Sequence, residues 1–180
     1  MSLAIAGHLE TTLSQCSSGF LKVFAGLAGT HRKTTVFISR RMVVSIVFII
    51  ATTALGEIGI AYVHLPELGG RREPRADSPH RALRVAAFRG YADHMSSAEF
   101  ARGYERLTGL ARESRTAFMC AETLWWRCHR RLIADRLTVD GWTVTHLFAP
   151  GKSEPHVLWD AARKAEGHLV YDAGTLPLPT

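Results

Sequence analysis

The stretch that decides the fold runs from residue 116 to residue 148 and reads TAFMCAETLWWRCHRRLIADRLTVDGWTVTHLF. Its first five residues, TAFMC, form a short apolar run typical of a buried strand. The segment CHRRLIADRLTVDG predicts a helix, because Leu132, Ile133 and Leu137 share one face and Gly141 follows as a C-terminal stop. WTVTHLF predicts the next strand. A strand, helix and strand joined by short links indicate a βαβ crossover with parallel pairing and a right-handed connection.

The sequence therefore predicts the fold class α/β: a single domain with a mainly parallel sheet flanked by helices on both faces, in three layers. A length of 180 residues with 47% hydrophobic content suits one core. Residues 1–58 are predicted to be the N-terminal part of this domain and residues 59–180 the remainder. In such sheets the ligand crevice lies beyond the carboxyl ends of the strands. The segment from Cys120 to Arg131 falls there.

Other elements follow from local patterns. Ile60 to Leu65 predicts a strand that Pro66 ends, and residues 71–80 predict an exposed loop. Ser96, followed three residues later by Glu99, predicts a capping box. The helix that it opens has one apolar face, formed by Phe100, Tyr104, Leu107 and Ala111. Near the C-terminus, VLWDAARKAEG predicts a short helix and HLVYD an extended segment.

Charge and cysteine content restrict the class of protein. The formal net charge is +6, carried mainly by arginine, and arginine can grip a phosphate or carboxylate at two points. An arginine-rich codon usage would give the same composition without a ligand. Three cysteines without a secretory signal predict a reducing cytoplasm. The apolar run Met42 to Leu55 is shorter than the roughly 20 residues of a spanning helix, so we expect a buried strand and no membrane partner.

Five pieces of sequence occur in a fixed order: GIAYVHLPELGGRR, FRGYADHM, FMCAE, RCHRRLIADRL and VTHL. With these pieces, the chain from about Gly59 to the C-terminus resembles the bacterial domain of unknown function 488 family. The joint occurrence of Cys-Ala-Glu and Cys-His-Arg is the most specific part of the resemblance. The resemblance implies an α/β sandwich of Rossmann-like character with an active cleft. It does not imply a reaction, because that of the family is not established.

The N-terminal third departs from the family pattern. The first family strand carries Thr-Ile-Gly-His/Tyr-Ser, of which only IAGH with Gly7 and His8 remains. The second ends in Asp-Val-Arg, and here LAGTHRKTT offers only Arg32. Because the length is preserved while the character is lost, we hypothesise a shifted reading frame over residues 9–53 and degraded N-terminal strands. Trp125 also replaces a proline that is common in the family.

The cysteine motif predicts nucleophilic chemistry. A thiol at a strand end, close to a helix N-terminus and arginines, has a lowered pKa and gains reactivity. Cys120 and Cys128 both meet this description. His129 is the candidate base, and Glu122 is the candidate orienting or proton-transferring group.

Three other interpretations of the motif remain open or weak. Free cysteines are often only buried packing residues, and a disulfide between Cys120 and Cys128 is conceivable. A zinc site would find at most three local ligands, Cys120, Cys128 and His129, so we predict no metal. No cofactor is indicated. The spacing from Cys120 to Arg127 is one residue too long for the phosphate loop of cysteine phosphatases.

A ligand-binding role is predicted for residues that bracket the expected crevice: Gly69, Gly70, Arg71, Arg89, Tyr91 and Arg130. Helix N-termini and arginines bind phosphate, and aromatic rings can stack on a base. The predicted ligand is a small phosphate-containing or nucleic-acid-derived anion, bound by an enzyme or a ligand-binding protein. The alternatives are a non-catalytic anion or nucleic-acid binding module and a frame-damaged, inactive family member. The sequence leaves open whether the protein is an enzyme, and it does not indicate the oligomeric state.

Overall fold

The computed structural model describes residues 2–6, 33–37, 55–57, 59–120, 124–149, 151–165 and 167–172. Several features named above lie outside these ranges. They are the Gly7 and His8 motif, Arg32, residues 42–54 of the apolar run Met42 to Leu55, and Glu122. The structure therefore does not test the predictions made for these residues. Leu55, the last residue of the strand predicted in that run, is buried but helical.

The described part of the chain contains eight strands and three α-helices with described bounds, and residues 55–57 are helical as well. The strands are β1 (Ser2–Ala6), β2 (Lys33–Phe37), β3 (Ile60–His64), β4 (Arg115–Met119), β5 (Thr143–Ala149), β6 (Lys152–Pro155), β7 (Ala162–Ala165) and β8 (His168–Tyr171). The helices are α3 (Ala86–His94), α4 (Ala98–Glu113) and α5 (Arg130–Val139). Two short 3-10 helices, η1 (Pro66–Leu68) and η2 (Trp125–Arg127), precede functional segments discussed below.

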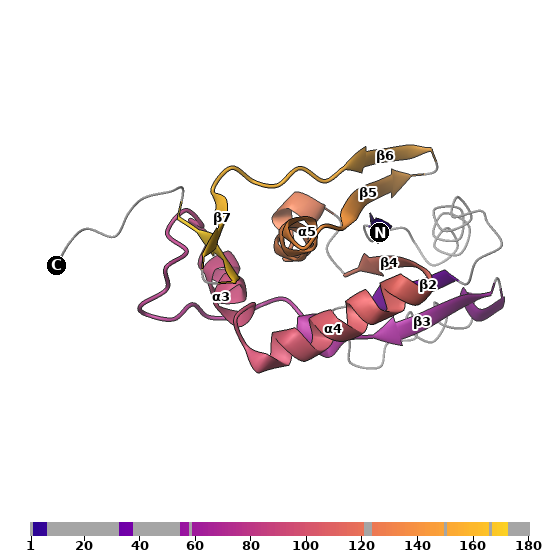
Figure 1. Ribbon diagram of the computed structural model, residues 1–180, viewed down its shortest axis with the longest axis horizontal. Coiled ribbons are helices and arrows are strands. Elements are labelled where there is room, and N and C mark those ends of the chain that lie inside the picture. The colour runs from indigo at the N-terminus through magenta and orange to yellow at the C-terminus, as the bar shows by residue number, and fades with distance from the viewer. Residues whose placement is uncertain are drawn as a thin grey trace, which may run out of the picture.

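Six strands form one sheet in the order β3-β2-β4-β1-β5-β6 (Figure 1). The pairs β3-β2, β2-β4, β4-β1 and β1-β5 are parallel. The predicted unit of β4, α5 and β5 is therefore confirmed as a pair of strands with the same direction, and β1 lies between them. The N-terminal segments that we expected to be degraded contribute β1 and β2 to this sheet. The reading-frame hypothesis concerns the gene and stays a prediction.

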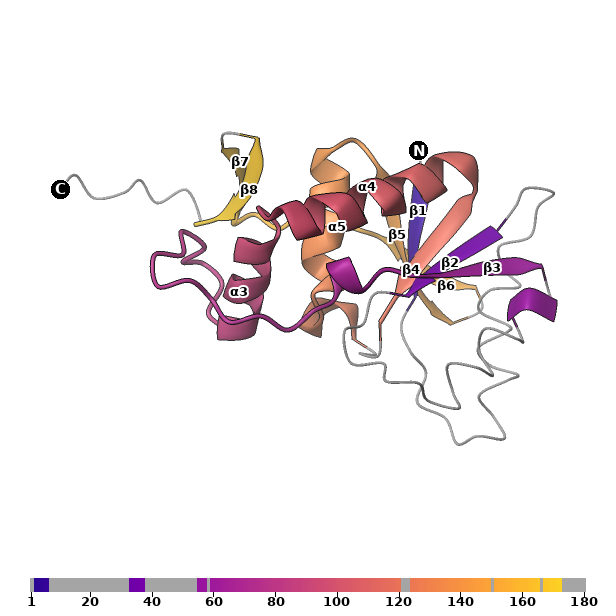
Figure 2. The ribbon, with the colours of Figure 1, turned by 90° about the horizontal axis from the view of Figure 1, so that it is seen from below.

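The predicted mainly parallel, Rossmann-like arrangement is wrong as a description of the whole fold and is corrected to a mixed α/β fold, in which antiparallel pairs accompany the four parallel ones. β6 pairs antiparallel with β5, and β7 and β8 form a separate antiparallel pair. Figures 1 and 2 show this pair at one end of the molecule beside α3, away from the six-stranded sheet. In the part of the chain that the structure describes, α3, α4 and α5 share one core cluster instead of forming two layers.

That core forms where the helices meet the sheet. Phe118 of β4 and Val144 of β5 are buried against residues of all three helices, among them Tyr91, Leu107 and Leu132. The predicted inward residues of α5 are at most 1% exposed, and Phe100 and Leu107 of α4 are at most 2% exposed. Both predicted apolar faces are confirmed. Burial of such faces supplies most of the stability of amphipathic helices.

The start of α4 lies one residue later than the capping box predicts. Ser97 is the N-cap, and its hydroxyl accepts a hydrogen bond from the Phe100 amide at 3.1 Å. Ser96 is exposed. The Ser97 hydroxyl also contacts Nδ1 of His94, three residues earlier, at 3.1 Å, and this local contact accompanies the choice of Ser97 as the cap.

The short helix predicted in VLWDAARKAEG is wrong, because Ala162–Ala165 forms β7. Pairing with β8 overrides a helix propensity that is only a weak local preference. Gly167, with φ of 81°, lies in the turn between the two strands, where a left-handed conformation favours glycine. Arg163 and Asp172 form an ion pair between the two strands' ends. The extended HLVYD segment is confirmed as β8.

None of the helices within the described ranges is long and apolar enough to cross a membrane.

We predict that Ser97→Ala lowers the free energy of unfolding by about 1 kcal/mol, because the first turn of α4 loses its side-chain acceptor. Ser96→Ala is the matched control and should change stability by less than about 0.5 kcal/mol. Urea unfolding followed by circular dichroism measures both. Equal losses in the two variants would contradict the assignment of the cap.

Candidate functional site

Two thiols meet at the carboxyl end of β4. Cys120 directly follows this buried strand, and Cys128 lies between η2 and α5. The amide of Cys128 donates to the carbonyl of Trp125, which turns the chain back toward the strand end. The two Sγ atoms are 2.9 Å apart, and each cysteine is 3% exposed. The structure therefore brings together two of the predicted catalytic residues.

Hydrogen-bond donors gather around the sulfur of Cys128. The backbone amide and Nε of Arg130 donate to Sγ at 3.5 and 3.4 Å, and Nδ1 of His129 lies 3.4 Å away. Burial by itself raises the pKa of the Cys128 thiol. The hydrogen bond from Cys120, the charge and hydrogen bond of His129 and the charge of Arg130 outweigh burial and lower this pKa to about 3. Cys128 is thus held as a thiolate.

The ring of His129 is fixed between two other segments. The centre of the Tyr91 ring lies 5.0 Å from that of His129. On the other side, a Cβ atom placed on Gly70 would lie 2.4 Å from Nδ1 of His129, so only glycine allows this approach. Nε2 of His129 is buried without a hydrogen-bond partner among the described residues. Gly70 and Tyr91, both predicted as ligand-binding residues, thus contact a predicted catalytic one.

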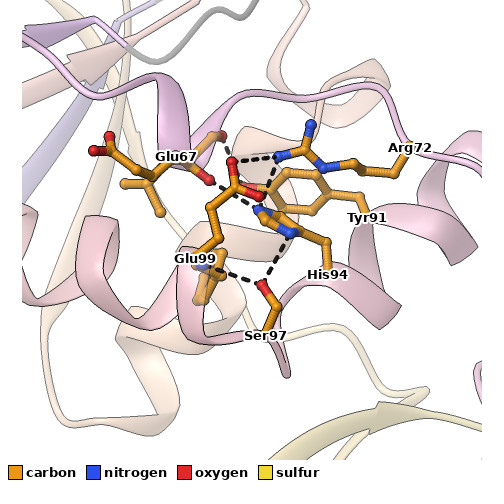
Figure 3. Close-up of polar contacts among 8 residues, drawn as sticks. Glu67, Arg72, Tyr91, His94, Ser97 and Glu99 are labelled. Carbon is orange, nitrogen blue, oxygen red and sulfur yellow. Dashed lines mark hydrogen bonds and ion pairs between the residues drawn. The ribbon is translucent and has the colours of Figure 1, made fainter.

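The segment 67–72 forms a wall beside His129 and is tied to α3 and α4 (Figure 3). The Tyr91 hydroxyl donates to the carbonyl of Leu68 at 2.9 Å, and Nε2 of His94 contacts the carbonyl of Glu67 at 2.8 Å. Nη2 of Arg72 lies 3.6 Å from Oε1 of Glu99. These contacts tie the segment to α3 and to the start of α4.

His94 joins three groups through its two ring nitrogens. Nε2 lies 2.8 Å from the carbonyl of Glu67, which only accepts, and 3.1 Å from Nη2 of Arg72, which only donates. The shorter contact favours a proton on Nε2. Nδ1 then accepts from the Ser97 hydroxyl, whose oxygen in turn accepts from the Phe100 amide. His94 therefore contacts both the N-cap of α4 and the wall segment 67–72, as Figure 3 shows.

The remaining predicted ligand residues lie in different surroundings. Arg130 is fully buried and directed at Cys128. Arg89 donates to the carbonyls of Leu83 and Arg84 ahead of α3. Arg71 is exposed and directly follows Gly70, and Gly69 is buried. The structure thus places Arg130 inside the thiol site and Arg89 in local contacts of α3, while Arg71 is exposed directly after Gly70 of the wall segment. Glu122 lies outside the described residues.

One group of side chains in the described ranges could approach a single metal ion: Cys120, Cys128 and His129, whose ligand atoms lie within 4.8 Å of one another. The cationic side chain of Arg130 already donates to the Cys128 sulfur. A second cation at that sulfur would meet electrostatic repulsion. We therefore assign no metal to this group.

A second buried polar cluster was missed by the sequence interpretation. Asp135 of α5 accepts from Nε2 of His156 at 2.9 Å, and Nδ1 of His156 contacts Nε2 of His146 on β5 at 2.9 Å. The Tyr171 hydroxyl donates to the other oxygen of Asp135 at 3.1 Å. Nδ1 of His146 is buried and has no hydrogen-bond partner among the described residues. A histidine within an otherwise apolar strand, VTHLF, was the available signal.

Trp125 covers this cluster from the surface side. Its ring stacks on that of His146 with centroids 3.6 Å apart, and its Nε1 donates to Glu154 at 3.1 Å. Burial, the charge of His156 and the charge of Arg130 lower the pKa of His146 to about 3. The cluster is therefore neutral at His146 near pH 7. Arg130 acts electrostatically on both clusters.

Fold and site together define a mixed α/β domain built around a buried pair of thiols. Residues 49–137 match the family model described as Domain of unknown function DUF488. Through residues 49–137 the chain belongs to this family, which confirms the resemblance drawn from the sequence up to residue 137; the resemblance of residues 138–180 stays a prediction. The matching span contains the wall segment, α3, α4 and the cysteine motif and ends before β5. No curated protein and no solved structure matches the chain.

We predict that Gly70→Ala lowers the free energy of unfolding by about 1–3 kcal/mol, because the added methyl group collides with the His129 ring. Gly109→Ala in α4 is the control. Nothing lies within 4 Å of its new Cβ, so it should raise stability by up to about 1 kcal/mol. Thermal unfolding of both variants gives the comparison. A stable Gly70→Ala protein would show that His129 does not hold the described position.

His146 makes stability depend on pH with a defined sign. Its pKa is lower in the folded state, so the unfolded chain binds more protons as the pH falls from about 6.5 toward 3. Its contribution is complete above pH 6.5 and is lost across that window. Replacing His146 by Phe should flatten the stability curve there, by up to about 1.4 kcal/mol per pH unit. Urea unfolding at pH 4.5, 5.5, 6.5 and 7.5 measures the slope, and parallel curves would contradict the assignment.

Proposed function

We propose that this chain is a thiol-dependent enzyme in which Cys128 attacks a small electrophile that carries a negative charge. The observation that carries the proposal is the arrangement at one sulfur: two donors from Arg130, with His129 and Cys120 in contact. A thiolate is the nucleophilic form of cysteine, and neighbouring cations and donors maintain it near neutral pH. Purely packing cysteines need no such donors.

Each neighbour takes a distinct role in this proposal. Arg130 stabilises the Cys128 thiolate, and His129 supplies or removes a proton at the substrate. Arg71, exposed beside the wall segment, attracts the anionic group, which could be a phosphate or a carboxylate. Glu122 is proposed to transfer protons, as its place in the motif indicates. The approach of an anion to a cationic border is also favoured by the net charge of +6.

A non-catalytic binding module for an anion or nucleic acid is the rival function. The low exposure of both cysteines, 3% each, favours it, because buried thiols often only pack. In that case exposed arginines alone would hold the partner, and binding would weaken steeply with salt. The two functions differ in whether the sulfur reacts in the folded protein.

A pair of alkylating reagents with the same leaving group tests the enzyme proposal. Iodoacetamide is neutral and iodoacetate is anionic; with both, a new S–C bond forms as iodide leaves. We expect Cys128 to react in the folded protein at a rate nearly constant from pH 5.5 to 7.5. A thiol of ordinary pKa gains about tenfold per pH unit in that range. Peptide mass spectrometry locates the modified cysteine, and Cys128→Ser removes the reaction.

Arg71→Gln should lower the rate with iodoacetate relative to iodoacetamide by about 2- to 5-fold, the size expected for one exposed charge. Arg102→Gln, on the exposed surface of α4, changes the net charge equally and is the control. If the ratio of the iodoacetate rate to the iodoacetamide rate falls equally in both variants, the effect comes from net charge and not from a local site. Reaction of Cys128 only after unfolding would support the binding module and overturn the enzyme proposal.

A further inference from the structure

We infer that Cys120 is a resolving thiol: oxidation of Cys128 closes a reversible disulfide between the two residues, which makes the site a redox centre. The inference rests on the proposed function, because it requires Cys128 to react as a nucleophile. It goes beyond that function by giving Cys120 a chemical role and naming the oxidant, a hydroperoxide.

The geometry of the two thiols carries this inference. A disulfide has its sulfurs about 2.0 Å apart, and the Sγ atoms here are 2.9 Å apart. Closing the bond therefore needs a shift of about 1 Å in total, which small side-chain rotations supply. Both cysteines are buried in the core cluster, so neither thiol meets another copy of the chain before it meets the other. An intramolecular bond is favoured over an intermolecular one.

The reaction proceeds in two steps with hydrogen peroxide as the oxidant. The Cys128 thiolate attacks one oxygen of the peroxide; the S–O bond forms, the O–O bond breaks, and hydroxide leaves and is protonated to water. This gives a sulfenic acid at Cys128. The Cys120 sulfur then attacks the Cys128 sulfur; the S–S bond forms and the S–O bond breaks. The departing hydroxide takes the proton of Cys120 and leaves as a second water.

The same contacts that create the thiolate make the disulfide easy to reduce. Arg130 and His129 stabilise the negative sulfur of the reduced state, and they lose this partner when a neutral disulfide forms. Stabilising the reduced state raises the reduction potential of a dithiol pair. We therefore expect an equilibrium with glutathione that favours the dithiol. The disulfide would form transiently under oxidant and reopen when the oxidant is removed.

Peroxide titration of the full chain tests the inference. With one equivalent of hydrogen peroxide, mass spectrometry of proteolytic peptides should show Cys120 joined to Cys128 in the wild-type protein, and dithiothreitol should restore both thiols. Cys120→Ala should instead accumulate sulfenic acid, trapped by dimedone, and then sulfinic acid. Cys16→Ser is the control and should behave like the wild type.

The outcomes separate this inference from the function it rests on. If Cys128 does not react with peroxide or with iodoacetamide, the proposed function fails. If Cys128 is alkylated and oxidised but proceeds to sulfinic acid equally fast with and without Cys120, only the resolving role is overturned. A bond between Cys16 and either site cysteine would likewise contradict it.

The redox equilibrium gives an independent test. We compare the midpoint, the ratio of reduced to oxidised glutathione at which half of the protein carries the disulfide. This ratio should be at least about threefold higher for His129→Asn than for the wild type, because one group that stabilises the thiolate is lost and the disulfide is then harder to reduce. The readout is the fraction of alkylation-protected protein at equilibrium, which a merely structural role of His129 would not move in this direction. An unchanged midpoint, or a shift toward the dithiol, would overturn the account.

Discussion

The site depends on a buried cation. The guanidinium group of Arg130 is fully buried at the first residue of α5, where removing a charge from water is costly unless an anion or strong acceptors face it. The sulfur of Cys128 is one such acceptor, at 3.4 Å from Nε. This pairing requires the end of β4, the turn at η2 and the start of α5 to converge. The contact therefore stabilises both groups, because Arg130 favours the thiolate form of Cys128 and the sulfur is one of the acceptors that offset the burial of Arg130.

On another side of the site, the backbone of segment 67–72 lies very close to its neighbours. The segment 67–72 passes between His129 and α3, and glycine is required at both contacts. A Cβ on Gly70 would meet the His129 ring, and a Cβ on Gly90 would lie 2.3 Å from the carbonyl oxygen of Arg72. Tyr91 and His94 then fix the segment through its carbonyls. The wall is thus held by packing and by hydrogen bonds, which limits the orientations of His129.

Local pattern determined the parts of this structure that depend on near neighbours. The apolar faces of α4 and α5, the strand before Cys120 and the proximity of Cys120, Cys128 and His129 all follow from residues close in sequence. Features that depend on a specific partner did not follow. The Ser97 cap involves His94 three residues earlier, β7 forms against β8 across a two-residue link, and the histidine cluster joins residues 135, 146 and 156. The pairing of a strand with its partner decides sheet class, and it cannot be read from one strand alone.

Arg130 also links the two buried clusters through its charge. It lowers the pKa of the Cys128 thiol and that of the His146 imidazole, and in each case it favours the form with one proton fewer. The results differ in charge, because the thiol becomes an anion while the imidazole stays neutral. Arg130 therefore couples the two clusters electrostatically, because one buried charge favours loss of a proton at the thiol site and at the histidine cluster on β5.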